Sequence, residues 1–269
     1  MHILSSKLVI PIAAIIVGVL FWFRPGGVEG PRAEPTAMTG KTFDHSGLTT
    51  VLAKVISPTG VVDYGALATA PADLDRYLGQ LATTSPKSAP QLFRTNDDRL
   101  AYYLNAYNAF VLAAVRDHCP LNDVQSVYFG GGFFWRLSFI MGREEVTLSD
   151  LEAERIRGVM RRNPEVHLAL VKGARGFPPL GQTAFEPARL QAQLQALAAR
   201  TAKDPRFVSR EGDVLRLSAL FEWYKSDFGD ALTWIAQHAP QMAKGKPAVE
   251  SVPFDWALNG TCGRSPPGG

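Results

Sequence analysis

Apolar residues recur at helical spacing through much of the chain, and several of these runs begin at residues that favour helix starts. Ser46 precedes one run and Pro71 opens another, in which Leu74, Leu78 and Leu81 share one face. The strongest pattern follows Asn96, and its apolar residues indicate a helix at the centre of the core; they are Leu100, Tyr103, Leu104, Tyr107, Val111 and Val115. The predicted helices cover about 46–57, a segment from residue 71, 96–117, 149–162, 187–202 and an aromatic segment from residue 218.

Two segments show the pattern of β-hairpins. Short apolar runs over 136–140 and 145–148 flank Met141-Gly142-Arg143-Glu144, and two further runs flank Arg210-Glu211-Gly212-Asp213. Helices outnumber these hairpins and do not alternate with strands. The pattern therefore predicts an α+β fold, a helix-rich single domain with short antiparallel hairpins.

The first forty residues differ from the rest. Residues 8–23 form an unbroken apolar run that ends in an aromatic pair and Arg24. We predict that residues 1–23 are an uncleaved transmembrane anchor, because no good cleavage site follows; a cleaved signal and a buried helix remain alternatives. A very short N-terminal tail before a large domain predicts an extracytoplasmic domain. Residues 24–40 are rich in Pro and Gly and predict a linker, with the globular domain at 41–260 and a disordered tail at 261–269.

Charge and composition exclude several classes of protein. Lys and Arg number 28 against 25 Asp and Glu, a surplus of only +3, which argues against nucleic acid as a partner. Two cysteines exclude a disulfide scaffold and a zinc site built from four thiolates. The chain lacks the spacings of common metal sites, nucleophile elbows and dinucleotide-binding loops, so we predict no metal and no cofactor.

His167 and Glu152 are the candidate catalytic residues. His167 interrupts an apolar run, and a partly buried imidazole can act as a general base, although a structural histidine is the alternative. Glu152 could orient that imidazole. The segment Ser149-Asp150-Leu151-Glu152 also matches a capping box, which would explain Glu152 without catalysis.

Asn105 and Asn108 lie three residues apart on the predicted central helix, where buried amides need partners. They either line a cleft or pin a neighbouring loop. Trp135 follows three glycines that permit a tight backbone path. Cys119 and Cys262 are either free thiols or, in an exported chain, a disulfide that closes a long loop.

Seven short segments, taken in order, resemble one family, the domain of unknown function 547. They include Ala101-Tyr102-Tyr103-Leu104-Asn105-Ala106-Tyr107-Asn108-Ala109, Val166-His167-Leu168-Ala169-Leu170, Pro178-Pro179-Leu180 and Trp223-Tyr224-Lys225-Ser226-Asp227-Phe228. The others are Val62-Asp63-Tyr64, Leu148-Ser149-Asp150-Leu151-Glu152 and Phe254-Asp255-Trp256-Ala257-Leu258-Asn259. The resemblance implies a constellation of Glu, His and Cys like that of a thiol peptidase, and it places Glu152 and His167 in the first two roles.

The cysteine of that constellation does not carry over to this chain. Where the family tends to have Cys, this chain has Lys172 and Phe177. A phenylalanine cannot form an acyl intermediate. We therefore expect a non-catalytic, membrane-anchored envelope protein, a possible pseudoenzyme that binds a peptide or another protein. Its candidate binding residues are Asn105, Asn108, Trp135, Lys172 and Phe177. The alternatives are a hydrolase that uses His167 and Glu152, and a purely structural protein.

Overall fold

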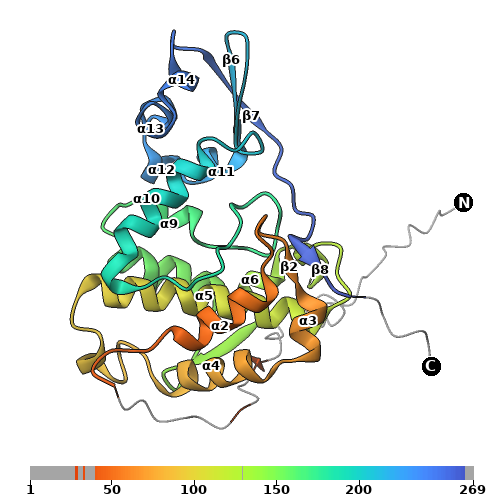
Figure 1. Ribbon diagram of the computed structural model, residues 1–269, viewed down its shortest axis with the longest axis vertical. Helices are drawn as coiled ribbons and strands as arrows, with labels where there is room; N and C mark the ends of the chain where they lie inside the picture. The colour runs from red at the N-terminus through yellow and green to blue at the C-terminus, as the bar shows by residue number, and fades with distance from the viewer. Residues whose placement is uncertain (1–27, 30–32, 34–39, 129, 264–269) are drawn as a thin grey trace, which may run out of the picture.

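The computed structural model describes residues 28–29, 33, 40–128 and 130–263, and these form an α+β fold that is rich in helix. Figure 1 shows α2 (Ser46–Val55), α3 (Tyr64–Thr69) and α4 (Ala72–Thr83) at one end of the molecule, and β6 (Val214–Ser218), α13 (Ala231–His238) and α14 (Pro240–Ala243) at the other. The α+β fold class predicted from the sequence is therefore confirmed. The predicted anchor over residues 1–23 lies outside the described residues. None of the helices in the described part has both the length and the apolar character required to span a membrane.

The central helix α5 runs over Asn96–His118 and forms the middle of the core. Thr95 and Asp98 cap its first turn reciprocally, each side chain accepting a hydrogen bond from the other residue's backbone N–H. Almost every residue from Leu100 to Arg116 is buried, because other elements cover α5 on all sides. The helices that precede it are α2 (Ser46–Val55), α3 (Tyr64–Thr69), α4 (Ala72–Thr83) and η1 (Pro90–Leu92).

The first predicted hairpin is confirmed as β3 (Ser138–Met141) paired antiparallel with β4 (Glu144–Thr147). A two-residue strand, β1 (Val28–Glu29), pairs parallel with β3 inside the segment predicted as a linker. Helical turns surround this hairpin and lead toward the site described below. They are η2 (Val124–Ser126), α6 (Gly132–Trp135), α7 (Leu148–Asp150), η3 (Leu151–Ile156), α8 (Arg157–Val159) and α9 (Glu165–Leu168).

The second predicted hairpin is confirmed as β5 (Val208–Glu211) and β6 (Val214–Ser218), and β7 (Ala248–Val252) adds a parallel strand that the sequence did not predict. A short parallel pair joins β2 (Val62–Asp63) to β8 (Gly260–Thr261). Thr261 of β8 lies in the segment predicted as the C-terminal tail. The helices of this half are η4 (Pro187–Arg189), α10 (Leu190–Thr201), α11 (Ala219–Trp223), α12 (Lys225–Phe228), α13 (Ala231–His238) and α14 (Pro240–Ala243).

A buried histidine makes the stability of this fold depend on pH. His45 is 5% exposed, its Nδ1 lies 2.8 Å from the hydroxyl of Tyr77, and burial lowers its pKa to about 4 against the smaller opposing effects of Asp44 and Asp98. In the unfolded chain the pKa is about 6.5. Because the unfolded state then binds more protons, the stabilisation is complete above about pH 6.5 and is lost as the pH falls toward 4.

We expect His45 alone to lower the free energy of unfolding by about 2 kcal/mol between pH 6.5 and pH 5. Urea denaturation at both pH values measures the loss in the native protein and in the variant His45→Gln, which keeps a polar partner for Tyr77. The variant should lose correspondingly less stability over this interval. An equal loss in both proteins would contradict the role given to His45.

Candidate functional site

Five side chains from distant parts of the chain meet in a partly enclosed polar centre. We define the polar centre as Glu152, His167, Lys172, Tyr224 and Asp227. Two of them lie on helical turns after the first hairpin, in η3 and α9, and Lys172 lies in the loop that follows α9. Tyr224 links α11 to α12, and Asp227 lies in α12. The polar centre therefore forms only when both halves of the fold have assembled.

Glu152 and Lys172 form an ion pair at the polar centre. Lys172 Nζ lies 2.5 Å from Glu152 Oε2, and the hydroxyl of Tyr224 donates to Glu152 Oε1 over 2.7 Å. Burial opposes the ionisation of Glu152, but the charge of Lys172 and these two hydrogen bonds outweigh burial, so the pKa of Glu152 lies below its ordinary value. The carboxylate is therefore ionised at neutral pH and both of its oxygens are occupied.

His167 is paired with Asp227 and not with Glu152. Its Nε2 lies 2.9 Å from Asp227 Oδ2, and its ring stacks on Tyr224 with 3.8 Å between the ring centroids. Arg157 also donates to the Asp227 carboxylate. Burial lowers the pKa of His167 below its ordinary value, against the raising effect of the hydrogen bond to Asp227. The predicted pairing of Glu152 with this imidazole is wrong, because the carboxylate hydrogen-bonded to His167 belongs to Asp227.

Two buried polar atoms beside the polar centre have no hydrogen-bond partner among the described residues. They are His167 Nδ1 and the hydroxyl of Tyr107. The side chain of His167 is only 2% exposed, so its free nitrogen does not face solvent. In this conformation the imidazole has the hydrogen-bonded carboxylate of a general base but no access for a substrate.

Aromatic rings enclose the ammonium group of Lys172. Its Nζ lies 5.9 Å from the ring centroid of Tyr107, 5.3 Å from that of Phe134 and 5.7 Å from that of Phe177. Phe177, which stands where the family resemblance implied a cysteine, is 2% exposed. The three rings, which we call the aromatic wall, thus surround the ammonium group of the ion pair.

A C-terminal strap, defined as residues 253–262, covers this aromatic wall. Phe254 packs on Phe177 with 5.1 Å between the ring centroids, and Trp256 lies 6.4 Å from Phe134. The backbone of the strap accepts hydrogen bonds from the amides of Arg175 and Gly176. Trp223, which is 48% exposed, packs against both strap aromatics and completes an aromatic surface on the outside.

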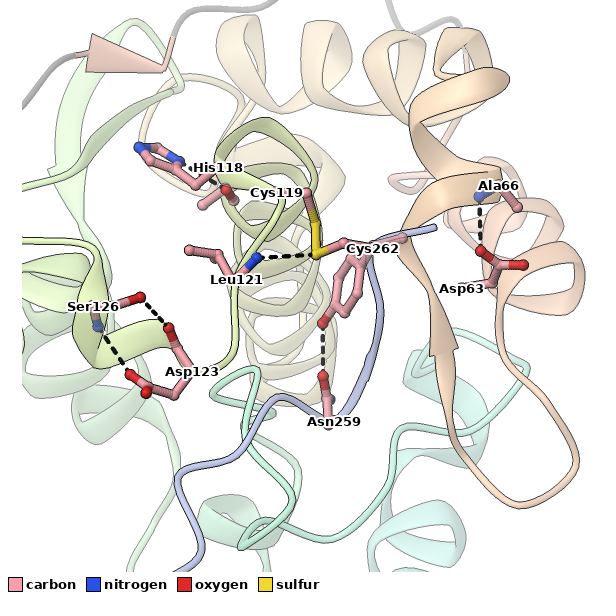
Figure 2. Close-up of a disulfide and its surroundings, with 11 residues drawn as sticks. Asp63, Ala66, His118, Cys119, Leu121, Asp123, Ser126, Asn259 and Cys262 are labelled. Atoms are coloured by element: carbon pink, nitrogen blue, oxygen red, sulfur yellow. Dashed lines mark hydrogen bonds between the residues drawn. A yellow bond between two sulfur atoms is a disulfide. The ribbon is translucent and has the colours of Figure 1, made fainter. Parts of the chain in front are cut away.

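A disulfide joins Cys119, directly after α5, to Cys262 at the end of the strap (Figure 2). The two Cα atoms lie 5.5 Å apart. Figure 2 also shows the backbone amide of Leu121 donating to Cys262 Sγ and the contact of Asn259 with a tyrosine hydroxyl, which belongs to Tyr64. Of the two alternatives left open by the sequence, the structure has the disulfide, so neither cysteine supplies a thiol to His167.

The two amides of α5 pin neighbouring loops. Asn108 donates to the carbonyl of Ala169 and accepts from the amide of Val171, while Asn105 exchanges the same pair of hydrogen bonds with Phe185. Both side chains are buried, and these backbone contacts use the donor and acceptor of each amide. They therefore position the loops on either side of residues 172–184, and a direct contact with a ligand stays a prediction.

The structure also places Trp135 and identifies the residues that form the capping box before Glu152. Trp135 ends α6, is 45% exposed and donates from its indole nitrogen to the carbonyl of Gly130. The capping box predicted for Ser149 and Glu152 is wrong, because the reciprocal cap is formed by Thr147 and Asp150. The helical segment begins at Leu148, which leaves Glu152 beyond its first turn and free to join the polar centre.

Two adjoining hollows lie beside the segment that directly follows His167. They have volumes of about 430 and 340 Å³, and we call them together the arginine groove. The larger hollow is lined by side chains such as Leu168, Val171, Phe185 and Leu197, and the smaller by Ser57, Thr59, Asp204 and Arg206. The residues common to both hollows are Pro179, Leu180, Gly181, Gln182 and Arg200.

Sequence reasoning missed Tyr224, Asp227 and Arg200. The first two lie in one of the segments that carry the family resemblance, but their aromatic neighbours indicated only a packed helix. Asp227 was the acidic residue of that segment and could have been weighed as a partner for His167. In the part of the chain that the structure describes, no group of three or more His, Cys, Asp or Glu residues is arranged to hold a metal ion.

The fold and the site define the class of this protein as an α+β domain built around a buried charged centre and closed by a disulfide-linked strap. A family model described as "Protein of unknown function, DUF547" matches residues 92–200, which confirms the resemblance predicted from the motifs. The match spans Glu152, His167, Lys172 and Phe177 and ends before Tyr224 and Asp227. The comparisons found no match among curated proteins or solved structures.

Proposed function

We propose that this chain is a non-catalytic binding module for a peptide or protein of the cell envelope, tethered to a membrane by its apolar N-terminal run. The observation that carries the proposal is the pairing of the polar centre's side chains with one another. Glu152 is held by Lys172 and Tyr224, and His167 is held by Asp227 beneath the ring of Tyr224. The charged groups compensate one another, so the centre stabilises the fold without needing a substrate.

Lys172 and Phe177, which stand where the family resemblance implied a cysteine, support the same proposal. Phe177 has no nucleophile, and Lys172 is engaged as a cation by Glu152, whereas amine nucleophiles act in the neutral form. Cys119 and Cys262 are bonded to each other. Each group that could stand in for the family's thiolate is thus occupied by a structural contact.

The arginine groove supports a function in ligand binding. Asn105 and Asn108 hold Phe185, Ala169 and Val171, and these three residues line its larger hollow. A pre-formed hollow of about 430 Å³ with a few polar groups is the usual form of a ligand site. The two asparagines of α5 would then shape the walls of a binding site without touching its ligand.

One observation favours a hydrolase as the second candidate. His167 and Asp227 have the geometry of a base and its orienting carboxylate, and the free Nδ1 of His167 could accept a proton if the site opened. In that case Asp227 would take the role that sequence reasoning gave to Glu152.

Turnover measurements separate the two candidates. We expect the full chain, reconstituted in lipid nanodiscs, to show no hydrolysis of fluorogenic peptides or p-nitrophenyl esters above that of its variant His167→Asn. Hydrolysis by the native protein that is lost in both His167→Asn and Asp227→Asn would overturn the proposal. The variant Lys87→Met, which breaks an exposed ion pair with Glu144 away from the site, controls for preparation.

A further inference from the structure

Arg200 is an unpaired cation between an apolar and a polar hollow. It lies in the last turn of α10 and lines both hollows of the arginine groove. Within the described residues its guanidinium has no hydrogen bond and no ion pair, whereas the neighbouring Arg206 is neutralised by Asp204. One positive charge in the groove is therefore available to an anionic group of a ligand.

The loop on the other side of the groove offers unused backbone donors. The amides of Leu180, Gly181, Gln182 and Thr183 donate to no acceptor among the residues that the structure describes. All four residues line the larger hollow. Successive free backbone amides beside an arginine are a known arrangement for capturing a chain-terminal carboxylate.

The larger hollow supplies the apolar part of the recognition. Leu168, Val171, Leu180 and Leu197 are buried in the fold and border the hollow beside Arg200. A ligand that complements the hollow places an apolar group there and an anionic group at Arg200, which lines the same hollow. The last residue of a peptide has both groups on one Cα atom, and its main chain can use the free amides of the loop.

We propose that the arginine groove binds the C-terminus of a peptide whose last residue is apolar, with Arg200 and the loop 180–183 contacting its carboxylate. This inference rests on the proposed function only in taking the ligand to be a peptide. Hydrolysis at His167 would refute the proposed function and leave groove binding to be measured, whereas failed peptide binding would leave the turnover result unaffected.

Fluorescence polarisation with the full chain in lipid nanodiscs tests the proposal. The probe is the fluorescein-labelled peptide Gly-Ser-Gly-Ala-Ala-Leu with a free carboxylate. We expect binding that weakens about tenfold when the carboxylate is an amide, and about tenfold when Leu is replaced by Ser, from the loss of a charge-assisted hydrogen bond and of apolar burial respectively. Equal binding of the acid and the amide would overturn the proposal.

Matched variants locate the binding. Arg200→Gln should weaken binding about tenfold, whereas Lys203→Gln, which removes an exposed charge three residues away and outside the groove, should leave it unchanged. Ala196→Trp places a ring in the larger hollow and should abolish binding, while Ala192→Trp, at an exposed position one turn earlier that does not line the hollow, should not.

The remaining outcomes contradict the proposal. Equal weakening in Arg200→Gln and Lys203→Gln would show non-specific attraction between charges. Binding of fluorescent decanoate at the groove together with no binding of the peptide acid would assign the site to an acyl chain instead. Circular dichroism of each variant verifies that a loss of binding is not a loss of fold.

Discussion

Replacing Lys172 by methionine is expected to lower the free energy of unfolding by about 3 kcal/mol at pH 7. The ammonium group of Lys172 holds the carboxylate of Glu152, and both side chains are less than one fifth exposed. Methionine keeps most of the side-chain volume but leaves a buried charge without its counterion. Urea denaturation followed by tryptophan fluorescence measures the loss.

Three comparisons show whether this loss comes from an uncompensated charge. The double variant Glu152→Gln with Lys172→Met should recover most of the stability, because a neutral amide can still accept from Tyr224. The single variant should lose less at pH 4.5, where the unpaired carboxyl binds a proton more readily. Lys87→Met breaks an exposed pair that water screens, and it should leave the free energy of unfolding nearly unchanged. A loss in Lys172→Met no larger than that in Lys87→Met would show that the pair does not stabilise the protein.

Local patterns in the sequence were sufficient to predict the framework around the site. The apolar spacing after Asn96 and the nearby helix-favouring residues located α5 almost to its ends, because capping and periodicity are properties of adjacent residues. The two hairpins followed from glycine-containing turns between short apolar runs. Asn105 and Asn108 were noticed for the same reason, since two amides on a buried helix require partners within reach.

The partnerships at the site could not be predicted, because they join residues far apart in the chain. His167 meets Asp227 across 60 residues, and Glu152 meets Tyr224 across 72. No local pattern ranks one carboxylate above another over such distances, and the nearer Glu152 was chosen for His167. The strand β7 was missed similarly, because its five residues become a strand only by pairing with β6.

The strap explains how a closed site and an exposed aromatic surface coexist. Phe254 lies against Phe177 on its inner side and against the half-exposed Trp223 on its outer side. Gly176 permits this approach, because a Cβ atom there would lie 2.5 Å from the ring of Phe254. The strap therefore contacts the aromatic wall on one side and the exposed Trp223 on the other.

Removing the disulfide by Cys119→Ser and Cys262→Ser is expected to cost about 5 kcal/mol of stability. The bond joins residues 143 apart in the sequence, and opening so long a loop restores much conformational entropy to the unfolded chain. Chemical denaturation of the native protein, with and without a dithiol reductant, measures the same quantity without mutation.

The folded state of this variant should keep its strap in place, because the strap has further attachments. The amides of Arg175 and Gly176 donate to it, Asn259 accepts from Tyr64, and β8 pairs with β2. The tryptophan emission of the folded variant should therefore equal that of the native protein, and the reductant should have no effect on the variant. If the variant instead loses less than about 1 kcal/mol and shows red-shifted emission before unfolding, the strap detaches by itself, and the bond holds the strap against the aromatic wall without stabilising the rest of the fold.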